Sequence, residues 1–422
     1  MIGETQIPAR EHEILAPAGS FESLAAAIQA GCDAVYFGVT QLNMRARAAS
    51  NFDLDDLGQI AAQCQTAGVR SYLALNSLLY PHDIRMMQRI LKTAQEFGVH
   101  AVIAADVATI ESAAMIGLPV HISTQLSVAN LESLRFWSRY ADTVVLAREL
   151  TLAMIDRIHQ GIVAEDIRGP SGHLIRIEVF AHGALCIAVS GRCGMSLYTD
   201  NASANRGACI QNCRKSYIVT DAETGMQLEI DNDYIMSPKD ICTIDFLDRL
   251  LASGVSVFKI EGRGRGPEYV SEVIACYREG LEAVRTKTYT AQKIQDWRYR
   301  LENVYNRGLS DGYYLGMQQG WSQNPHNQAR TEKVFVGQVL HYYPRAGIMQ
   351  ISLNAMPLEL DQEIIITGPT TGLVRTTIQN LRSVEDQDLR QAPKGSLVTV
   401  PVPSKVRLHD KVYLIRGHEH KR

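Results

Sequence analysis

Residues 13–38 read EILAPAGSFESLAAAIQAGCDAVYFG, and they set the pattern for most of the chain. Two short apolar runs, EILAP and AVYF, flank a segment in which apolar residues recur at helical spacing. Ser20 suits an N-cap at the start of that segment, and Gly31 suits a left-handed cap after its end. A strand, a helix and a second strand in this order predict one parallel β-α-β unit.

The same pattern recurs from Ile14 to about Arg285. The apolar runs are EILAPAG, DAVYFG, RSYLALN, AVIAAD, VHISTQ, TVVLARE, RIEVFAHG, YIMSPKD and VFKIEGR. Strands that alternate with helices in this number predict an α/β fold, a (β/α)8-like TIM-type barrel over residues 1–285. One of the nine runs is expected outside the barrel or in a hairpin, near LEIDNDYIMSPKD at 228–240. A doubly wound open sheet is the alternative.

The amino-acid composition and the pattern of apolar residues change after the predicted barrel. Residues 286–330 include GLSDGYYLGMQQGWSQNPHNQ, whose Gly, Asn and Gln content indicates a linker or a wrapping segment. Over residues 331–422, six short strand patterns are separated by Gly, Pro and Asp. They predict a small all-β C-terminal barrel, a type of fold that suits RNA binding.

Composition limits the partners and the compartment. The formal net charge is −3, which argues against wholesale electrostatic capture of nucleic acid and leaves a local basic patch open. The start MIGETQIPAREHE is polar and acidic, and no run of ~18 apolar residues occurs, so neither a signal peptide nor a membrane span is expected. We therefore expect a cytoplasmic protein, in which clustered cysteines bind metal or do redox work more often than they form disulfides.

Four of the eight cysteines fall within a cysteine-rich insertion at 183–216, and they are Cys186, Cys193, Cys209 and Cys213. Six residues separate the first pair, and three separate the second. The second spacing fits a structural zinc pair and the first does not, so spacing leaves a 4Fe-4S cluster, zinc and unligated redox thiols open. The other cysteines lie in apolar contexts and are expected to be buried; they are Cys32, Cys64, Cys242 and Cys276.

Polar residues follow the apolar runs, where the strands are expected to end. Catalytic residues of a (β/α) barrel sit at the carboxyl ends of the strands, so these side chains are expected to converge on one mouth. The alternative role of each polar residue is to cap a helix or to form an ion pair with a neighbour in the sequence, as Arg148 and Glu149 would. The candidate catalytic residues are His182, Arg148, Glu149, Lys239, Asp240 and Glu261. The candidate substrate-binding residues are Arg45, Arg47, Asn76, Gln125, Arg192 and Arg263.

The segment FAHGALCIAVSGRC, followed by NRGACIQNCR, resembles the U-32 peptidase family, the collagenase-like peptidases. The resemblance extends to LAPAGSFESLAAAIQAGCDAVYFG, VHISTQLSVAN, VVLAREL, SPKD and KIEGRGR, and it covers about residues 13–320. It implies that the four cysteines of the insertion bind a 4Fe-4S cluster. Arg45, His182 and Arg192 match family positions. The length and the cysteine pattern are most similar to family members that hydroxylate tRNA.

That resemblance implies a tRNA uridine hydroxylase, which converts wobble uridine to 5-hydroxyuridine without oxygen and takes the hydroxyl from prephenate. Prephenate is a dicarboxylate, so arginine forks at a barrel mouth suit it. The C-terminal barrel is then expected to contact tRNA phosphates, although a solvated charged face suits the same residues: Lys405, Arg407, Lys411 and Arg416. An electron-transfer or accessory protein stays open as a partner, and the sequence does not fix the oligomeric state.

Three alternatives remain. The first is a hydroxylase of another target, such as ribosomal RNA or a quinone precursor. The second is a collagenase-like peptidase, although the chain has no HExxH motif and no GxSxG nucleophile elbow. The third is a non-enzymatic RNA-binding module with structural zinc.

Overall fold

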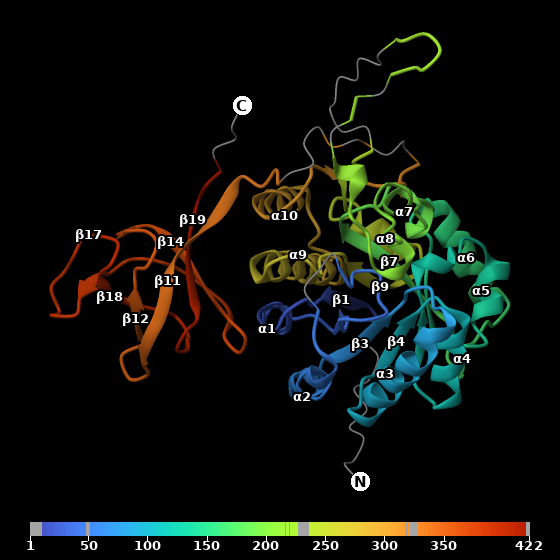
Figure 1. Ribbon diagram of the computed structural model, residues 1–422, viewed down its shortest axis with the longest axis horizontal. Helices are drawn as coiled ribbons and strands as arrows, with labels where there is room; N and C mark the ends of the chain where they lie inside the picture. The colour runs from blue at the N-terminus through green and yellow to red at the C-terminus, as the bar shows by residue number, and fades with distance from the viewer. Residues whose placement is uncertain are drawn as a thin grey trace.

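Eight parallel strands close into a barrel in the N-terminal part of the chain (Figure 1). Each strand pairs with its neighbour, and the last strand pairs with both the seventh and the first, which closes the circle. The alternative of an open sheet is therefore wrong. The strands are β1 (Glu13–Pro17), β2 (Ala34–Phe37), β3 (Arg70–Leu75), β4 (Ala101–Ala104), β5 (Val120–Ile122), β6 (Thr143–Val145), β7 (Arg176–Gly183) and β9 (Val255–Ile260).

The computed structural model describes residues 11–47, 51–215, 217–218, 220–226, 236–316, 320, 322 and 327–418. Helices surround the barrel strands as the alternating pattern predicts, and the Oγ of Ser20 caps the first helix by accepting from the N–H of Ser23. No helix in these ranges is long and apolar enough to cross a membrane. The helices are α1 (Phe21–Gln29), α2 (Leu57–Ala67), α3 (Ile84–Glu96), α4 (Val107–Met115), α5 (Leu131–Trp137), α6 (Leu152–Ala164), α8 (Leu247–Ala252) and α9 (Pro267–Arg285).

The ninth apolar run lies outside the barrel, as expected. Strand β8 (Asp240–Cys242) begins at the last residue of the YIMSPKD stretch and runs antiparallel to the end of β7. Strand β10 (Leu309–Ser310) pairs with β8 in parallel. The expected hairpin at 228–240 lies mostly outside the described residues, so only its end is seen.

The stretch 286–330 holds more regular structure than its composition indicates. Helix α10 (Ala291–Asn303) begins at an N-cap on Thr290, whose Oγ1 accepts from the backbone of Lys293. Trp297 is buried against α9, and its Nε1 donates a hydrogen bond to Glu279 at 2.7 Å. This part of the stretch therefore packs on the barrel as a helix and is not a simple linker.

The C-terminal region is all-β, and the six predicted strands are present. Together with the short strand β16 they form an antiparallel sheet in the order β15-β14-β19-β11-β12-β18-β16, and β13 and β17 form a separate ribbon. Their inward side chains form an apolar core of their own, which includes Val336, Ile351 and Val412. The strands are β11 (Thr331–Tyr343), β12 (Ile348–Ser352), β13 (Leu358–Glu359), β14 (Glu363–Gly368), β15 (Gly372–Thr377), β16 (Arg382–Ser383), β17 (Gln391–Ala392), β18 (Leu397–Pro401) and β19 (Lys411–Gly417).

The C-terminal sheet packs beside α1 and α9 of the barrel (Figure 1). The amide of Gln29 donates to the backbone oxygen of Thr371 at 2.7 Å and accepts from the N–H of Leu373 at 3.1 Å. The Nζ of Lys333 lies 2.8 Å from Glu268 on α9. These contacts join the two parts of the chain.

Two of the four expected phosphate contacts on this sheet have partners within the protein. The Nη1 of Arg407 donates to the Oγ1 of Thr371 at 3.1 Å, and Arg416 pairs with Glu332 at 2.7 Å. Lys405 and Lys411 are exposed. The charged face therefore offers fewer available cations to a nucleic acid than its sequence indicates.

Candidate functional site

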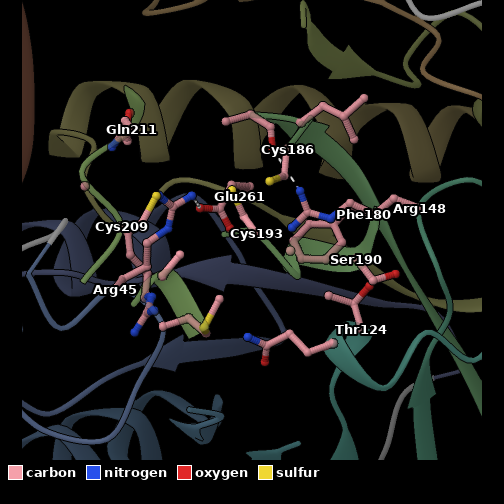
Figure 2. A pocket seen from close by; sticks show the side chains of 18 of the residues that line it. Arg45, Thr124, Arg148, Phe180, Cys186, Ser190, Cys193, Cys209, Gln211 and Glu261 are labelled. Carbon is pink, nitrogen blue, oxygen red and sulfur yellow. Dashed lines mark hydrogen bonds and ion pairs between the residues drawn. The ribbon is translucent and has the colours of Figure 1, made fainter. Parts of the chain in front are cut away.

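A cavity of ≈ 300 Å³ lies at the carboxyl ends of the barrel strands. Side chains from the strand ends form its floor and walls, and the cysteine-rich insertion closes over it (Figure 2). Of the candidate residues from sequence, ten line it: Arg45, Asn76, Gln125, Arg148, Glu261, Arg263, Cys186, Cys193, Cys209 and Cys213. The convergence expected of a barrel mouth is thus observed for most of the set.

The cysteine-rich insertion folds back onto the barrel through polar anchors. Glu149 accepts a hydrogen bond from the backbone N–H of Ser190 at 3.0 Å. The Nε of Arg192 donates to the backbone oxygen of Gln125 at 3.1 Å. Within the insertion, the Nη2 of Arg214 donates to the backbone oxygen of Leu185 at 2.7 Å and ties the end of the insertion to its start. Glu149 and Arg192, which were expected to act on substrate, therefore hold the insertion in place and do not line the cavity.

The four cysteines of the insertion surround one cavity as free thiols. Burial raises the pKa of Cys213, Arg214 opposes this, and the neighbouring Cys186, Cys209 and Cys193 raise it further. The sulfurs are thus close enough to influence one another. Within the described ranges, no three His, Cys, Asp or Glu side chains are arranged to hold a metal ion. The donor set, four thiols around one cavity, suits a thiolate-bound cluster.

Arg45 and Glu261 form an ion pair at the cavity wall. The Nη2 of Arg45 lies 2.9 Å from the Oε1 of Glu261, and Tyr36 donates its hydroxyl to the other oxygen at 3.2 Å. Burial alone would raise the pKa of Glu261, but Arg45, Arg148 and Arg263 outweigh it and lower that pKa to about 2. Figure 2 shows Cys209 beside Arg45, whose pKa is raised first by Glu261 and also by that thiol.

Arg148, Asn76 and Gln125 shape the remaining wall. The guanidinium of Arg148 lies 3.7 Å from the ring centroid of Phe180 and donates to the backbone of the insertion at Ala184, at 3.1 Å. Asn76 accepts from the backbone N–H of Met44 at 3.2 Å. Gln125 accepts from the hydroxyl of Ser123 at 3.0 Å. These partners fix the side chains in orientations that border the cavity.

Arg263 lines the cavity and carries an unsatisfied buried donor beside it. Its side chain is only 5% exposed, and its Nη1 is buried without a hydrogen-bond partner in the part of the chain that the structure describes. Burial lowers the pKa of Arg263. Buried donors normally find partners, so an unpartnered guanidinium nitrogen beside a cavity suits an anionic ligand.

The cavity lining carries a strong excess of positive charge. Glu261 is the one carboxylate among the described lining residues, and it already pairs with Arg45. A low-dielectric cavity with this charge favours an anion with more than one negative group. The lining cations are Arg45, Arg148, Arg214, Lys259, Arg263, Arg265 and Arg307.

His182 does not open onto the cavity, so this expectation is wrong. It is 1% exposed and packs against Tyr269 and Tyr277 of α9, and burial lowers its pKa to about 3. Side chains of a strand alternate, which would place His182 on the same side as Phe180. The pairing of β7 with β9 shifts register between these two residues, and such an irregularity turns the following side chain to the other face.

Lys239, Asp240 and Arg47 also lie outside the cavity lining. Asp240 is buried beside Arg307, with 3.6 Å between the two charged groups, because β8 runs outside the barrel. Lys239 precedes that same strand. Arg47 is exposed, and its backbone bonds to Gly207 of the insertion. Closeness to an apolar run in the sequence therefore did not predict where these three side chains lie.

Lining residues outside the catalytic and substrate-binding sets include Tyr36 and Arg307. Lys259 also lines the cavity, as expected of a charged residue near the end of the apolar run VFKIEG. Tyr36 reads as an ordinary core aromatic residue within DAVYFG. Arg307 follows α10 and reaches the cavity only through the tertiary fold.

The chain is a (β/α)-barrel protein whose cationic cavity, edged by four cysteines of an inserted segment, suits an anionic ligand. Residues 19–324 match the model of peptidase family U32, and the chain belongs to that family.

Its relatives carry names of two kinds. It is 49% identical over 404 residues to a collagenase of Porphyromonas gingivalis, covering 96% of this chain and 97% of that protein. It is 30% identical over 424 residues to tRNA hydroxylation protein P1 of Bacillus subtilis, covering 98% and 96%. It is 32% identical over 318 residues to a 23S rRNA 5-hydroxycytidine synthase of Escherichia coli, covering 73% of this chain and 46% of that protein.

Proposed function

We propose that this chain is a tRNA-modifying enzyme that hydroxylates wobble uridine to 5-hydroxyuridine, with prephenate as the hydroxyl donor. The observation that carries the proposal is the unpartnered Nη1 of Arg263 in a cationic cavity edged by four cysteines. Support also comes from relatives named for hydroxylation of tRNA and ribosomal RNA.

The cavity chemistry suits a dicarboxylate. Arg263 offers a free N–H to one carboxylate, and Arg148 lines the same cavity above Phe180. Guanidinium groups bind carboxylates through two parallel hydrogen bonds, which also fixes the orientation of the bound molecule. The paired Glu261 keeps Arg45 in place and leaves the net charge of the cavity positive. A uracil must leave the base stack to reach such a site, as bases do in other modifying enzymes.

The cysteine-rich insertion would hold the cofactor. Cys186, Cys193, Cys209 and Cys213 are the residues that would bind a 4Fe-4S cluster, and the cluster would supply one-electron chemistry at the edge of the cavity. Arg45 lies beside Cys209 and would offset the negative charge of a cluster-bound thiolate there. Zinc is the alternative metal, and it supplies no electrons.

Peptidase activity is the second candidate, because the relative named collagenase is 49% identical. Thiol peptidases need a base beside the nucleophile. No histidine occurs among the described residues that line the cavity, so a Cys–His pair is not seen there. The geometry therefore favours the hydroxylase.

Mass spectrometry of tRNA nucleosides, with and without the gene, tests the proposal. We expect 5-hydroxyuridine and its derivatives to disappear from tRNA of the deletion strain and to return when the gene is restored. Unchanged tRNA together with loss of 5-hydroxycytidine from ribosomal RNA would move the activity to another RNA. Unchanged RNA together with gelatin cleavage by the purified chain would establish the peptidase instead.

The variant Cys209→Ala tests the cofactor. Protein purified without oxygen should be brown, and the variant should lose both the colour and the tRNA modification. Cys64→Ala is the matched control, because Cys64 is fully buried in α2 and far from this role. A colourless wild-type protein that contains zinc would exclude the redox chemistry.

A further inference from the structure

Lys259 places a buried ammonium group at the cavity. Its residue is 4% exposed, and it lines the cavity from β9. Its Nζ lies 2.6 Å from the Oε1 of Glu178 on β7, which is fully buried. The interiors of such barrels are normally packed with branched apolar side chains. Replacing a buried ion pair with apolar residues is often neutral or stabilising, so stability alone does not explain this pair.

Glu178 is held from its second side by His121. The Nδ1 of His121 on β5 lies 3.2 Å from the Oε2 of Glu178. Burial would raise the pKa of Glu178, but Lys259 and then His121 outweigh it and lower that pKa to about 2. The carboxylate therefore stays charged at neutral pH, and it keeps the ammonium of Lys259 in a fixed position.

The remaining surroundings of this ammonium are aromatic and face the cavity. The Nζ of Lys259 lies 4.6 Å from the ring centroid of Tyr36 and 5.5 Å from that of Phe180, and both rings line the cavity. An ammonium group has three N–H donors. Glu178 is its one hydrogen-bond acceptor among the described residues. Donors are thus available to a molecule bound above the two rings.

This arrangement differs from that of the arginines around it. Arg45 and Arg148 have protein partners that fix them along the wall, and Arg263 has a free nitrogen that suits a resting carboxylate. Lys259 combines a rigid carboxylate support with donors directed at the bound molecule. Preorganised donors of this kind stabilise charge that develops during a reaction.

We propose that Lys259 is a catalytic residue of this cavity, whose ammonium donates a hydrogen bond to an oxygen of the bound carboxylate substrate on which negative charge builds. Glu178 and His121 are positioning residues that act through Lys259. No bond forms between Lys259 and the substrate, and no proton leaves the ammonium. The inference rests on the proposed hydroxylase function and names a residue for it.

Kinetics of tRNA hydroxylation with the full chain test this assignment, with prephenate as the varied substrate. For Lys259→Met we expect kcat to fall by ~100-fold or more, with KM for prephenate changed less than about threefold, because a donor used in the transition state is lost. Lys92→Met is the matched control, because Lys92 is 75% exposed on α3. It should behave as wild type.

Two more variants keep the test decisive if Lys259→Met does not fold. Lys259→Arg keeps the charge and the pairing but moves the donor, so it should fold normally and still lose about tenfold or more in kcat. Glu178→Gln should lower kcat by about tenfold and leave KM for prephenate within about threefold of wild type, a split that a merely structural role would not produce. Folding of each variant is checked by circular dichroism.

Three outcomes overturn the proposal. Full kcat in folded Lys259→Arg and Lys259→Met shows that the ammonium is not used. A raised KM with unchanged kcat makes Lys259 an anchor for the substrate and not a catalytic residue. Absence of product from the wild-type protein in the same assay removes the proposed function, and the catalytic role of Lys259 with it.

Discussion

The guanidinium of Arg45 lies 2.9 Å from the carboxylate of Glu261, although 216 residues separate the two in the chain. Arg45 belongs to the loop after β2, and Glu261 follows β9. Their pairing ties the loop that touches the cysteine-rich insertion to the end of the barrel sheet.

Removal of Arg45 should destabilise the fold. Arg45→Met leaves Glu261 buried with less compensation, and we expect the free energy of unfolding to fall by ~2–3 kcal/mol, less than for a fully buried pair because Arg45 is 31% exposed. Denaturation in urea measures this. Arg47→Met, two residues away on an exposed side chain, is the control and should change stability by less than ~0.5 kcal/mol. Equal losses in both variants would show that the ion pair contributes nothing.

Acid should lower the free energy of unfolding, because Glu178 becomes protonated. Its pKa is about 2 in the folded state and 4.5 ordinarily, so the folded state binds fewer protons between these values. The contribution is fully present above pH ~4.5 and is lost as pH falls toward 2, and it amounts to on the order of 3 kcal/mol. Stability measured from pH 6 to 2 should therefore fall less steeply below pH 4.5 in Glu178→Gln. The exposed Glu111→Gln should follow the wild-type curve, and a Glu178→Gln curve parallel to wild type would contradict the assignment.

Mild acid should lower the stability of the fold through His182, over a higher pH range than the one in which Glu178 titrates. Burial lowers its pKa from 6.5 to about 3, so the folded state keeps it neutral while the unfolded chain takes up a proton below pH 6.5. Stability is therefore lost as pH falls from 6.5 toward 3, at about 1.4 kcal/mol per pH unit from this group. His182→Phe should remove that slope between pH 6 and about 4.5. His173→Phe, at an exposed position, should retain it, and an unchanged slope in His182→Phe would show that the imidazole charges freely in the fold.

A methyl group at Gly38 should displace Arg263. A Cβ at this position would lie 2.3 Å from the Nη1 of Arg263, which must then move away from its place in the cavity. We expect Gly38→Ala to fold and to raise KM for prephenate by about tenfold, the equivalent of one lost hydrogen bond to a charged group. Gly417→Ala, where a Cβ meets nothing within 4 Å, is the control. Wild-type affinity in Gly38→Ala would show that Arg263 does not bind the substrate.

Much of the fold is predictable because its signals are local. The alternation of apolar runs and helical stretches from Ile14 onward reflects strands buried on both faces and helices with one apolar side, and both properties are visible residue by residue. Caps such as Ser20 mark where helices begin for the same reason. The all-β C-terminal region is predictable because its short strand patterns are separated by turn residues. Helix α10 was missed, because the Gly- and Asn-rich segment after it dominates the composition of that stretch.

The candidate site was predictable only in part. The four cysteines and the strand-end arginines stand out by residue type, and the barrel geometry brings them together, because all parallel strands end at the same mouth. His182 was misplaced, because a register shift between Phe180 and His182 depends on how β7 pairs with β9. Asp240 was misplaced because β8 leaves the barrel.

The sequence by itself determined the barrel, the all-β region and the thiols of the insertion, since each depends on a pattern within a short stretch. Only the tertiary structure decided which charges meet. The pairing of Lys259 with Glu178, and of Arg45 with Glu261, joins residues on different strands and loops, and the energy of such pairs depends on distance and burial in space. No spacing along the chain records that distance, so the electrostatic character of the cavity appears only when the barrel closes.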